Sequence, residues 1–425
     1  MRYIISILFL GLIFNASAQN EPIKVLDEKE VNFMFNYYEQ DGSHSPVTGG
    51  IGSEKLECVA PQTSLNIPFD TVHNISVTLG IDHYTSASCD QIDRFITAAS
   101  SEYLSSASSK DTRVHCDVSY TYHNPVSNNE KGFMLGISKE FDVVSLAAGL
   151  NYSIASEDEN RQLILKASAY YDTWKLMYPG EIRDGEDYLY GNTPNDYDLD
   201  ARTTATFTAT YAQVLTRNLQ VLFTADYVMQ RGILHSPFHR VYFNDPFVVF
   251  DPDTNSMLAW KTMRPENLPR ARNKFPMAMR VSYFVNDFII TRLYYRYYFD
   301  DFDMTGHTFS MEIPIKLSSW LSVYPLFRYH EQTASKYFAP FAEHPVDPMT
   351  WEPTEEFYTS DYDVSALTSR KYGGGFRISP IYGIANVKNK NNTISFKSLE
   401  ARFAQYNRSD GLEAWYISFA MGFVF

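Results

Sequence analysis

Apolar and polar residues alternate along most of this chain, and the C-terminal segment shows the pattern most clearly. One parity carries mainly large apolar side chains and the other mainly small ones, since Trp415, Ile417, Phe419, Met421, Phe423 and Phe425 alternate with Ala414, Tyr416, Ser418, Ala420, Gly422 and Val424. Successive side chains of a β-strand point to opposite faces. The alternation therefore predicts a strand with one apolar face.

The same alternation recurs along the whole length. Segments of about ten residues are typical of tilted strands that cross a membrane. The pattern predicts an all-β fold, a transmembrane antiparallel β-barrel of about sixteen strands, with fourteen as the alternative count. The predicted strands cover residues 30–40, 56–66, 73–84, 111–123, 131–141, 143–154, 160–174, 201–213, 217–230, 277–285, 288–300, 305–317, 319–332, 369–380, 393–406 and 411–425.

The predicted connections fall into two classes. Short polar turns alternate with long insertions, which cover 41–55, 85–110, 175–200, 231–276 and 333–368. Because strands alternate in direction, all the long insertions lie at one end of the predicted barrel. Long extracellular loops and short periplasmic turns are the topology of outer-membrane barrels.

Composition favours the same fold class. Aromatic residues make up 16% of the chain, with 31 Tyr and 30 Phe, although the mean hydropathy is −0.29. A membrane barrel combines these properties because lipid-facing and lumen-facing residues alternate. A net charge of −14 argues against nucleic acid as a partner, since binding to phosphates requires a basic surface.

The N-terminus predicts a secreted protein. Arg2 precedes an apolar run over 3–14 and then Ala16-Ser17-Ala18, the small-residue pattern that signal peptidase cleaves. We therefore expect a signal peptide at 1–18 and a single barrel domain at 19–425, located in the outer membrane of a Gram-negative bacterium. A retained N-terminal anchor is the alternative.

Of the three cysteines, Cys58 and Cys89 can form a disulfide in an oxidising compartment.

The C-terminal strand carries a candidate membrane-insertion signal. Its large apolar residues are Trp415, Phe419, Phe423 and the terminal Phe425. This ending resembles the signal that the barrel-assembly machinery reads in outer-membrane proteins. We therefore expect outer-membrane lipid and that machinery as partners.

Charged residues on the polar parity predict the inner wall of the barrel. The lumen candidates are Arg280, Arg292, Arg296, Arg328, Glu312, Asp226 and Lys166. The four arginines come from neighbouring strands and could form a ladder that selects anions. In the alternative interpretation they pair with Glu312 and other acids and make the wall rigid.

Evidence for a metal or a catalytic site is weak. Asp251, Asp253 and Asn255 resemble the first half of a calcium loop, but the glycine and the distant glutamate of that motif are missing. An Asp-rich turn is the simpler interpretation, and the same alternatives apply to Asp300, Asp301 and Asp303. No other cofactor is expected. Neither Gly-x-Ser-x-Gly nor His-Glu-x-x-His occurs, so we do not expect an enzyme.

Two functions fit these features. The first is a passive pore or export channel for a small polar solute, because the first strand starts too close to the N-terminus for a plug domain. The second is a non-conducting barrel that serves as a docking or assembly scaffold for periplasmic or surface lipoproteins. The loops 231–276 and 333–368 are long enough to fold inward.

Six short motifs resemble an uncharacterised family of outer-membrane β-barrels, catalogued only as a domain of unknown function. They are YYEQDGSH at 37–44, TGG at 48–50, YTSAS at 84–88, KASAYYDTW at 166–174, YHEQTA at 329–334 and TSDY at 359–362. The resemblance implies an outer-membrane barrel with no assigned substrate and no assigned functional residues. It also implies gene neighbours for a periplasmic flavin-attaching enzyme and thioredoxin-like proteins, which would link the scaffold to extracytoplasmic redox systems.

Overall fold

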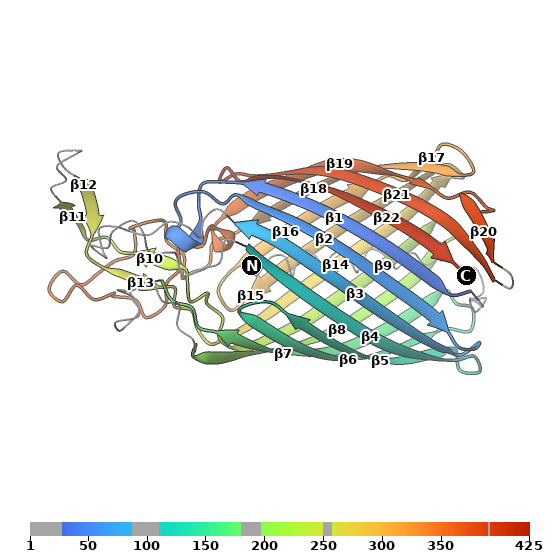
Figure 1. Cartoon of the computed structure of the whole chain (residues 1–425), viewed down its shortest axis with the longest axis horizontal. Coiled ribbons are helices and arrows are strands. Elements are labelled where there is room, and N and C mark those ends of the chain that lie inside the picture. Colours follow the sequence, from blue (N-terminus) through green and yellow to red (C-terminus); the bar gives the residue numbers. More distant parts are fainter. Residues whose placement is uncertain (1–27, 87–109, 180–196, 250–256, 390–391) are drawn as a thin grey trace.

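Long antiparallel strands close into a barrel in the computed structural model, which describes residues 28–86, 110–179, 197–249, 257–389 and 392–425 (Figure 1). Sixteen strand positions surround the barrel. The strands are β1 (Glu30–Asp41), β2 (Leu56–Pro68), β3 (His73–Ser86), β4 (Lys110–Asn124), β5 (Asn129–Lys139), β6 (Val143–Ala155), β7 (Arg161–Lys175), β8 (Leu199–Thr216), β9 (Leu219–Gly232), β14 (Ala271–Asn286), β15 (Ile289–Asp300), β16 (Thr305–Glu312), β18 (Leu321–Gln332), β19 (Leu367–Ile378), β21 (Asn392–Arg408) and β22 (Glu413–Val424).

Two short strands extend these positions. β17 (Ile315–Lys316) continues β16 between β15 and β18, and β20 (Ala385–Asn389) pairs with β21 beyond the end of β19. Each barrel strand pairs with its neighbour in sequence, and β1 closes the ring by pairing with β22. Lys29 and Phe425 exchange two backbone hydrogen bonds of 3.0 Å at this seam. The two ends of the described chain therefore complete the barrel.

The predicted fold class and strand count are confirmed, and the alternative of fourteen strands is wrong. The largest error in a strand boundary is at β14, which begins at Ala271 rather than at 277. Pro276 interrupts the alternation there and has no N–H to donate. The pairing of β14 with β9 skips Phe275 and Pro276 and resumes at Met277. The strand therefore tolerates the proline without ending.

The outer face of the barrel is apolar. Side chains on the outward parity are exposed although they are large and hydrophobic, as Phe33, Leu79, Ile137, Leu150, Phe207, Phe327 and Phe403 illustrate. A strand of 12 residues such as β15 is about 40 Å long at about 3.3 Å per residue. Tilted by about 40°, it spans about 30 Å, the thickness of a hydrocarbon core.

The long connections leave one end of the barrel, which is opposite to the end where the C-terminus lies (Figure 1). The other end has short turns, such as the two-residue turn between β8 and β9. Four small strands lie in the β9–β14 connection: β10 (Arg240–Tyr242) pairs with β13 (Met263–Pro265), and β11 (Pro246–Val249) pairs with β12 (Met257–Trp260). The five longest connections thus lie at one end, as the sequence predicted, together with the short turns 140–142, 301–304 and 409–412.

Helical structure in the described residues consists of two short 3-10 segments, η1 (Pro46–Thr48) and η4 (Tyr362–Val364). Within the same part of the chain, no helix has the length and apolar character needed to cross a membrane.

Candidate functional site: a cationic wall and a folded cap

The structure places the predicted lumen residues on the inner face of the barrel. Each lies directly opposite an inward-facing residue of the next strand, for example Arg292 opposite Glu312 and Lys166 opposite Thr208. Their neighbours of opposite parity, such as Met277 and Tyr295, are exposed and face outward. Period-two alternation of side chains therefore fixes which residues can meet inside. The lumen candidates located in this way are Arg280, Arg292, Arg296, Arg328, Glu312, Asp226 and Lys166.

One side of the inner wall is rich in cations. We call this set the cationic wall, and it extends from β14 to β21 with Arg280, Arg292, Arg296, Arg328, Lys371 and Arg402. Several members lie in one cross-strand row, in which each residue is the direct neighbour of the next. The row runs Arg280, Tyr294, Ser310, Arg328, Lys371, Tyr406.

Glu312 partly neutralises the cationic wall. Its carboxylate accepts Arg292 Nη1 at 2.9 Å and lies 3.5 Å from Arg402 Nη1. Arg402 also donates from Nε to Glu400 at 2.6 Å. These contacts match the interpretation in which arginines brace the wall through Glu312.

Tyrosine rings contact most cations of the cationic wall. The Arg402 guanidinium lies 4.7 Å from the centroid of the Tyr324 ring, and Lys371 Nζ lies 4.2 Å from that of Tyr416. Longer contacts of the same kind join Arg280 with Tyr294 at 5.9 Å and Arg296 with Tyr298 at 5.7 Å. An aromatic face attracts a cation but does not cancel its charge. These cations therefore keep their electrostatic attraction for an anion.

Three members of the cationic wall form no ion pair with any described carboxylate: Arg296, Arg328 and Lys371. Arg328 and Lys371 are direct cross-strand neighbours. Arg296 Nε is buried and has no hydrogen-bond partner among the described residues. Like charges that face each other across strands are destabilising. An anion between them would relieve that repulsion.

On the opposite side of the inner wall, from β3 to β8, two arginines are matched with buried aspartates, and we call this side the paired wall. Arg113 binds Asp82 through Nε at 2.7 Å and through Nη2 at 2.5 Å. Arg202 binds Asp172 in the same way, at 2.8 and 2.7 Å, and its guanidinium stacks 5.0 Å from Trp174. These two-point contacts satisfy buried charges locally.

Lys166 and Asp226 lie in one row of the inner wall, separated by Thr208. The Thr208 hydroxyl donates to Asp226 at 2.6 Å. Asp226 belongs to β9, which joins the two walls because it pairs with β8 and with β14. Lys166 thus has a carboxylate in its own row, unlike Arg328 and Lys371.

Three long loops fold together over the mouth of the barrel, and we call them the cap. The cap comprises the described parts of residues 42–55, 233–270 and 333–366. It has its own apolar cores: Val241 and Phe243 pack on Tyr358, and Leu234 and Val364 join a second cluster. The loops are therefore a packed structure and not separate excursions.

The second core joins the cap to the barrel. It contains Leu234, Leu268 and Val364 from the cap together with Phe302 and Met304 from the β15–β16 turn. Tyr298 of the inner wall packs against this cluster. Arg272 binds the buried Asp300 at the same rim and lies 4.3 Å from the Phe302 ring. Apolar packing therefore fixes the cap on the cationic side of the mouth, and the ion pair joins β14 to β15 beneath it.

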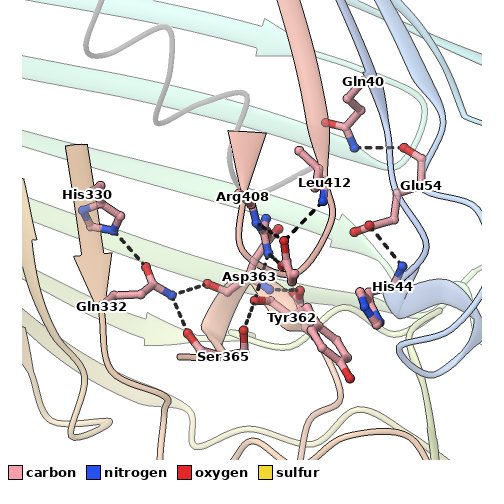
Figure 2. A network of polar contacts seen from close by, with 12 residues as sticks. Gln40, His44, Glu54, His330, Gln332, Tyr362, Asp363, Ser365, Arg408 and Leu412 are labelled. Carbon is pink, nitrogen blue, oxygen red and sulfur yellow. Dashed lines mark hydrogen bonds and ion pairs between the residues drawn. The ribbon is translucent and has the colours of Figure 1, made fainter. Parts of the chain in front are cut away.

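A polar network holds the loop before β19 against the inner rim (Figure 2). Arg408 at the end of β21 binds the Asp363 carboxylate and donates to the Tyr362 carbonyl at 3.1 Å. Gln332 at the end of β18 donates to the Asp363 and Ser365 carbonyls at 2.9 and 2.8 Å. The chain around η4 is thus fixed by inward-facing residues of two strands.

The β1–β2 loop completes this network. Glu54 accepts the His44 N–H at 3.1 Å, and the Gln40 amide donates to the Glu54 carbonyl at 2.9 Å. The His44 ring stacks on Tyr362 with centroids 3.9 Å apart. Burial raises the pKa of the Glu54 carboxyl, although the His44 N–H bond opposes this shift. Residues of four sequence motifs, at 37–44, 48–50, 329–334 and 359–362, therefore meet at the mouth.

Two groups of side chains have the geometry to hold a metal ion. His239, Glu266 and Asp361 meet inside the cap, with one ligand atom from each within 4.8 Å of the others. Asp111, Glu140 and Asp142 meet in the same way at the rim, beside the β5–β6 turn. The first group offers one nitrogen and two oxygens, and the second offers oxygen alone.

The metal residues predicted from sequence differ from these groups. Asp251, Asp253 and Asn255 lie outside the described residues. Among the other candidates, Asp300 binds Arg272 and the N–H groups of Phe302 and Met304, while Asp303 lies 3.3 Å from Lys336. These carboxylates already accept hydrogen bonds or ion pairs from arginine, lysine and backbone N–H groups.

The predicted membrane-insertion residues lie on the outer face at the barrel seam. Trp415 packs on Tyr37 with ring centroids 5.1 Å apart, and Phe423 packs on Phe33 at 5.7 Å. Phe419 and Phe425 are exposed.

The predicted signal peptide at 1–18 and Cys89 lie outside the described residues, whereas Cys58 and Cys116 are free thiols.

Sequence reasoning missed Lys371 and the groups that close the cap. Lys371 lies within a predicted strand, and its parity shared with the neighbouring inward residues was a usable signal. Glu266 and Asp361 come from loops far apart in the chain. No periodicity operates across such a distance, so only the folded structure brings them together.

Comparisons with known proteins give a family but no function. A family model described as "Protein of unknown function (DUF3570)" matches residues 6–409. No curated protein matches the sequence.

Solved barrels resemble the fold only loosely. CdiB from Acinetobacter baumannii has a TM-score of 0.44 at 10% identity, over 93% of this chain and 60% of CdiB, so this chain spans less than two thirds of that protein. A bacterial polysaccharide outer membrane secretin also has a TM-score of 0.44, at 8% identity over 93% of this chain and 98% of the secretin. A TodX monoaromatic hydrocarbon channel mutant has a TM-score of 0.39 at 9% identity, over 94% and 90% of the two chains. Likenesses this weak carry no functional assignment.

Proposed function

The chain belongs to the DUF3570 family of proteins of unknown function, and we propose that it is an outer-membrane barrel that conducts a small anionic solute. Support for the membrane location comes from the barrel itself. Its outward parity exposes large apolar side chains over a height that suits a bilayer. Closed barrels and helices are the structures that satisfy all backbone hydrogen bonds in lipid.

One observation carries the anionic preference. Arg328 and Lys371 face each other on the inner wall, and no described carboxylate forms an ion pair with either. A wall that served only as a brace would pair its cations, as Arg113 and Arg202 of the opposite wall are paired with Asp82 and Asp172. A barrel of sixteen strands is wide enough to leave a water-filled interior, where rings of arginine and lysine favour anions.

The cap makes a scaffold the second candidate. It is a packed unit with two apolar cores above the mouth, larger than a passive pore requires. Met349 at its surface is 92% exposed and Trp351 is 43% exposed, and exposed apolar side chains of this kind suit a protein partner. In this alternative the barrel anchors the cap, and a surface lipoprotein docks on it without solute flux.

Reconstitution separates the two functions. The mature chain is folded into planar bilayers in potassium chloride, and chloride flux is measured in parallel with chloride-loaded liposomes. The proposal predicts steady channels and chloride release. A barrel that is folded, as judged by its heat-modifiable gel mobility, but silent in both assays would refute conduction and leave the scaffold. Density fractionation of membranes tests the location, since a chain found with the inner membrane would contradict it.

A further inference from the structure

The rim of the barrel holds three carboxylates whose arrangement nothing above explains. Asp111 lies at the start of β4, and Glu140 and Asp142 belong to the turn between β5 and β6. One carboxylate oxygen from each lies within 4.8 Å of the other two. This cluster lies on the paired side of the mouth and contains none of Asp251, Asp253 and Asn255, the residues for which the sequence suggested a calcium loop.

Asp142 is the most constrained of the three. Only 3% of its surface is exposed, and its Oδ1 is buried without a hydrogen-bond partner among the described residues. A buried carboxylate oxygen normally accepts at least one hydrogen bond or coordinates a cation. Asp142 therefore has one unsatisfied carboxylate oxygen, and its side chain belongs to a cluster of like charges.

The donors that contact the cluster are uncharged. Asp111 accepts the Thr112 N–H at 2.6 Å and the Phe141 N–H at 3.3 Å. The Tyr84 hydroxyl lies 2.8 Å from Glu140 Oε2 and 3.2 Å from Asp111 Oδ2, but it is uncharged. Arg113, the basic residue on the adjoining inner face of β4, uses its Nε and Nη2 on Asp82. Among the described residues, no basic side chain therefore forms an ion pair with any of the three acids.

From this geometry we infer that Asp111, Glu140 and Asp142 form a calcium site at the rim of the barrel. Carboxylate oxygens are the ligands that calcium prefers, and calcium accepts six to eight oxygens in flexible geometry at about 2.3–2.6 Å. Two oxygens bound to one such ion can lie up to about 5 Å apart, which accommodates the observed spacing. Imidazole and thiol ligands, which favour transition metals, are absent from this cluster.

The ion would join β4 to the β5–β6 turn beyond the last ladder pair of β4 and β5, Val114 with Lys139. Tyr84 of β3 is the cross-strand neighbour of Asp111 and contacts two of the ligands through its hydroxyl. Calcium would therefore fix the start of β4 against the β5–β6 turn. This inference does not depend on conduction, so either can fail while the other stands.

The experiment compares wild type with Asp142→Asn in detergent, once with EDTA and once with calcium chloride. Without calcium and above pH 7, the variant should be the more stable protein, because the amide removes a buried like charge. With calcium, the order should reverse, since only wild type gains an ion. Thermal unfolding measures both orders, and equilibrium dialysis should give one calcium per wild-type chain and at least tenfold weaker binding for the variant.

Two further variants serve as controls: one removes a second proposed ligand, and the other removes a carboxylate far from the cluster. Glu140→Gln should also lose the calcium response, whereas Glu157→Gln, in an exposed turn at the opposite end, should keep it. The inference is overturned if Asp142→Asn binds calcium as wild type does. It is equally overturned if wild type binds no calcium at millimolar concentration, because a shared proton would then be what stabilises the cluster.

Discussion

The two sides of the inner wall differ in how their charged side chains are paired. On the paired wall, Arg113 and Arg202 each make a two-point contact with one buried aspartate. On the cationic wall, Glu312 accepts two arginines while Arg328 and Lys371 face each other. Both walls belong to one continuous sheet with the same strand geometry. The difference therefore lies in side-chain choice and not in backbone architecture.

The energetics show why the contrast matters. At a separation of about 5 Å, two like charges repel by about 1 kcal/mol in water and about 3 kcal/mol at an effective dielectric constant of 20. An anion that enters between them recovers part of this energy. A matched buried pair offers an entering ion no such gain, because its charges are already satisfied. One wall is suited to rigidity and the other to attracting a solute.

Removing one partner from each wall should give the largest difference in stability. Arg113→Met leaves Asp82, which is 2% exposed, buried and unpaired, and should lower the free energy of unfolding by about 3 kcal/mol. Arg328→Met removes repulsion and should change it by less than about 1 kcal/mol, in the stabilising direction. Urea unfolding in lipid vesicles measures both values. Equal losses in the two variants would contradict the contrast between the walls.

A substitution in the cap should have an intermediate effect. Gly50 has a φ of +91°, and a Cβ there would lie 2.8 Å from the Ser360 carbonyl oxygen. Gly50→Ala should cost about 1–2 kcal/mol in backbone strain, plus the clash, and should loosen the contact between the β1–β2 and β18–β19 loops. Hydrogen exchange at cap amides measures the loosening.

Gly411→Ala is the matched control for this substitution. Its φ is +92°, but nothing lies within 4 Å of the added Cβ. It should therefore show the strain without the clash, and its cap amides should exchange as in wild type. Identical exchange in both variants would mean that Gly50 does not fix the cap.

The smallest effect should be a pH dependence at the rim. Burial, and then the nearby Glu140, raise the pKa of Asp142 to about 7, whereas an unfolded aspartate titrates near pH 4 (about 3.9). The native state thus holds a proton that the unfolded state releases. Without calcium, this residue's contribution to stability should fall as the pH rises from about 4 to about 7.

Asp142→Asn tests this dependence, because the amide does not titrate. Stability of wild type and variant, measured by urea unfolding in EDTA at several pH values, should differ in slope between about pH 4 and pH 7. Parallel curves would show that Asp142 titrates normally in the folded protein.

Periodicity predicted most of the fold but little of the cap. Every barrel strand could be located because lipid on one side and polar groups on the other impose alternation, and the parity of Arg292 or Glu312 follows directly. The ion pairs of Glu312 could not be chosen from parity alone, since several arginines share its face. Partner choice depends on register, which alternation leaves open by steps of two residues.

The cap depends on contacts that have no sequence period. His44 stacks on Tyr362, and Arg408 binds Asp363, across long stretches of chain. The sequence showed the motifs that contain His44 and Tyr362, but it did not show that these residues contact each other. The calcium cluster was missed for the same reason, because Asp111 and Asp142 lie on opposite sides of a hairpin.

The most direct test of the central claim is the reversal potential of single channels under a potassium chloride gradient. Wild type should be anion-selective, and Arg296→Glu with Arg328→Glu should shift the reversal potential towards cation selectivity. Lys166→Glu on the opposite side, in the row of Asp226, should shift it less. A reversal potential that the double substitution leaves unchanged would contradict the claim that the cationic wall selects the solute.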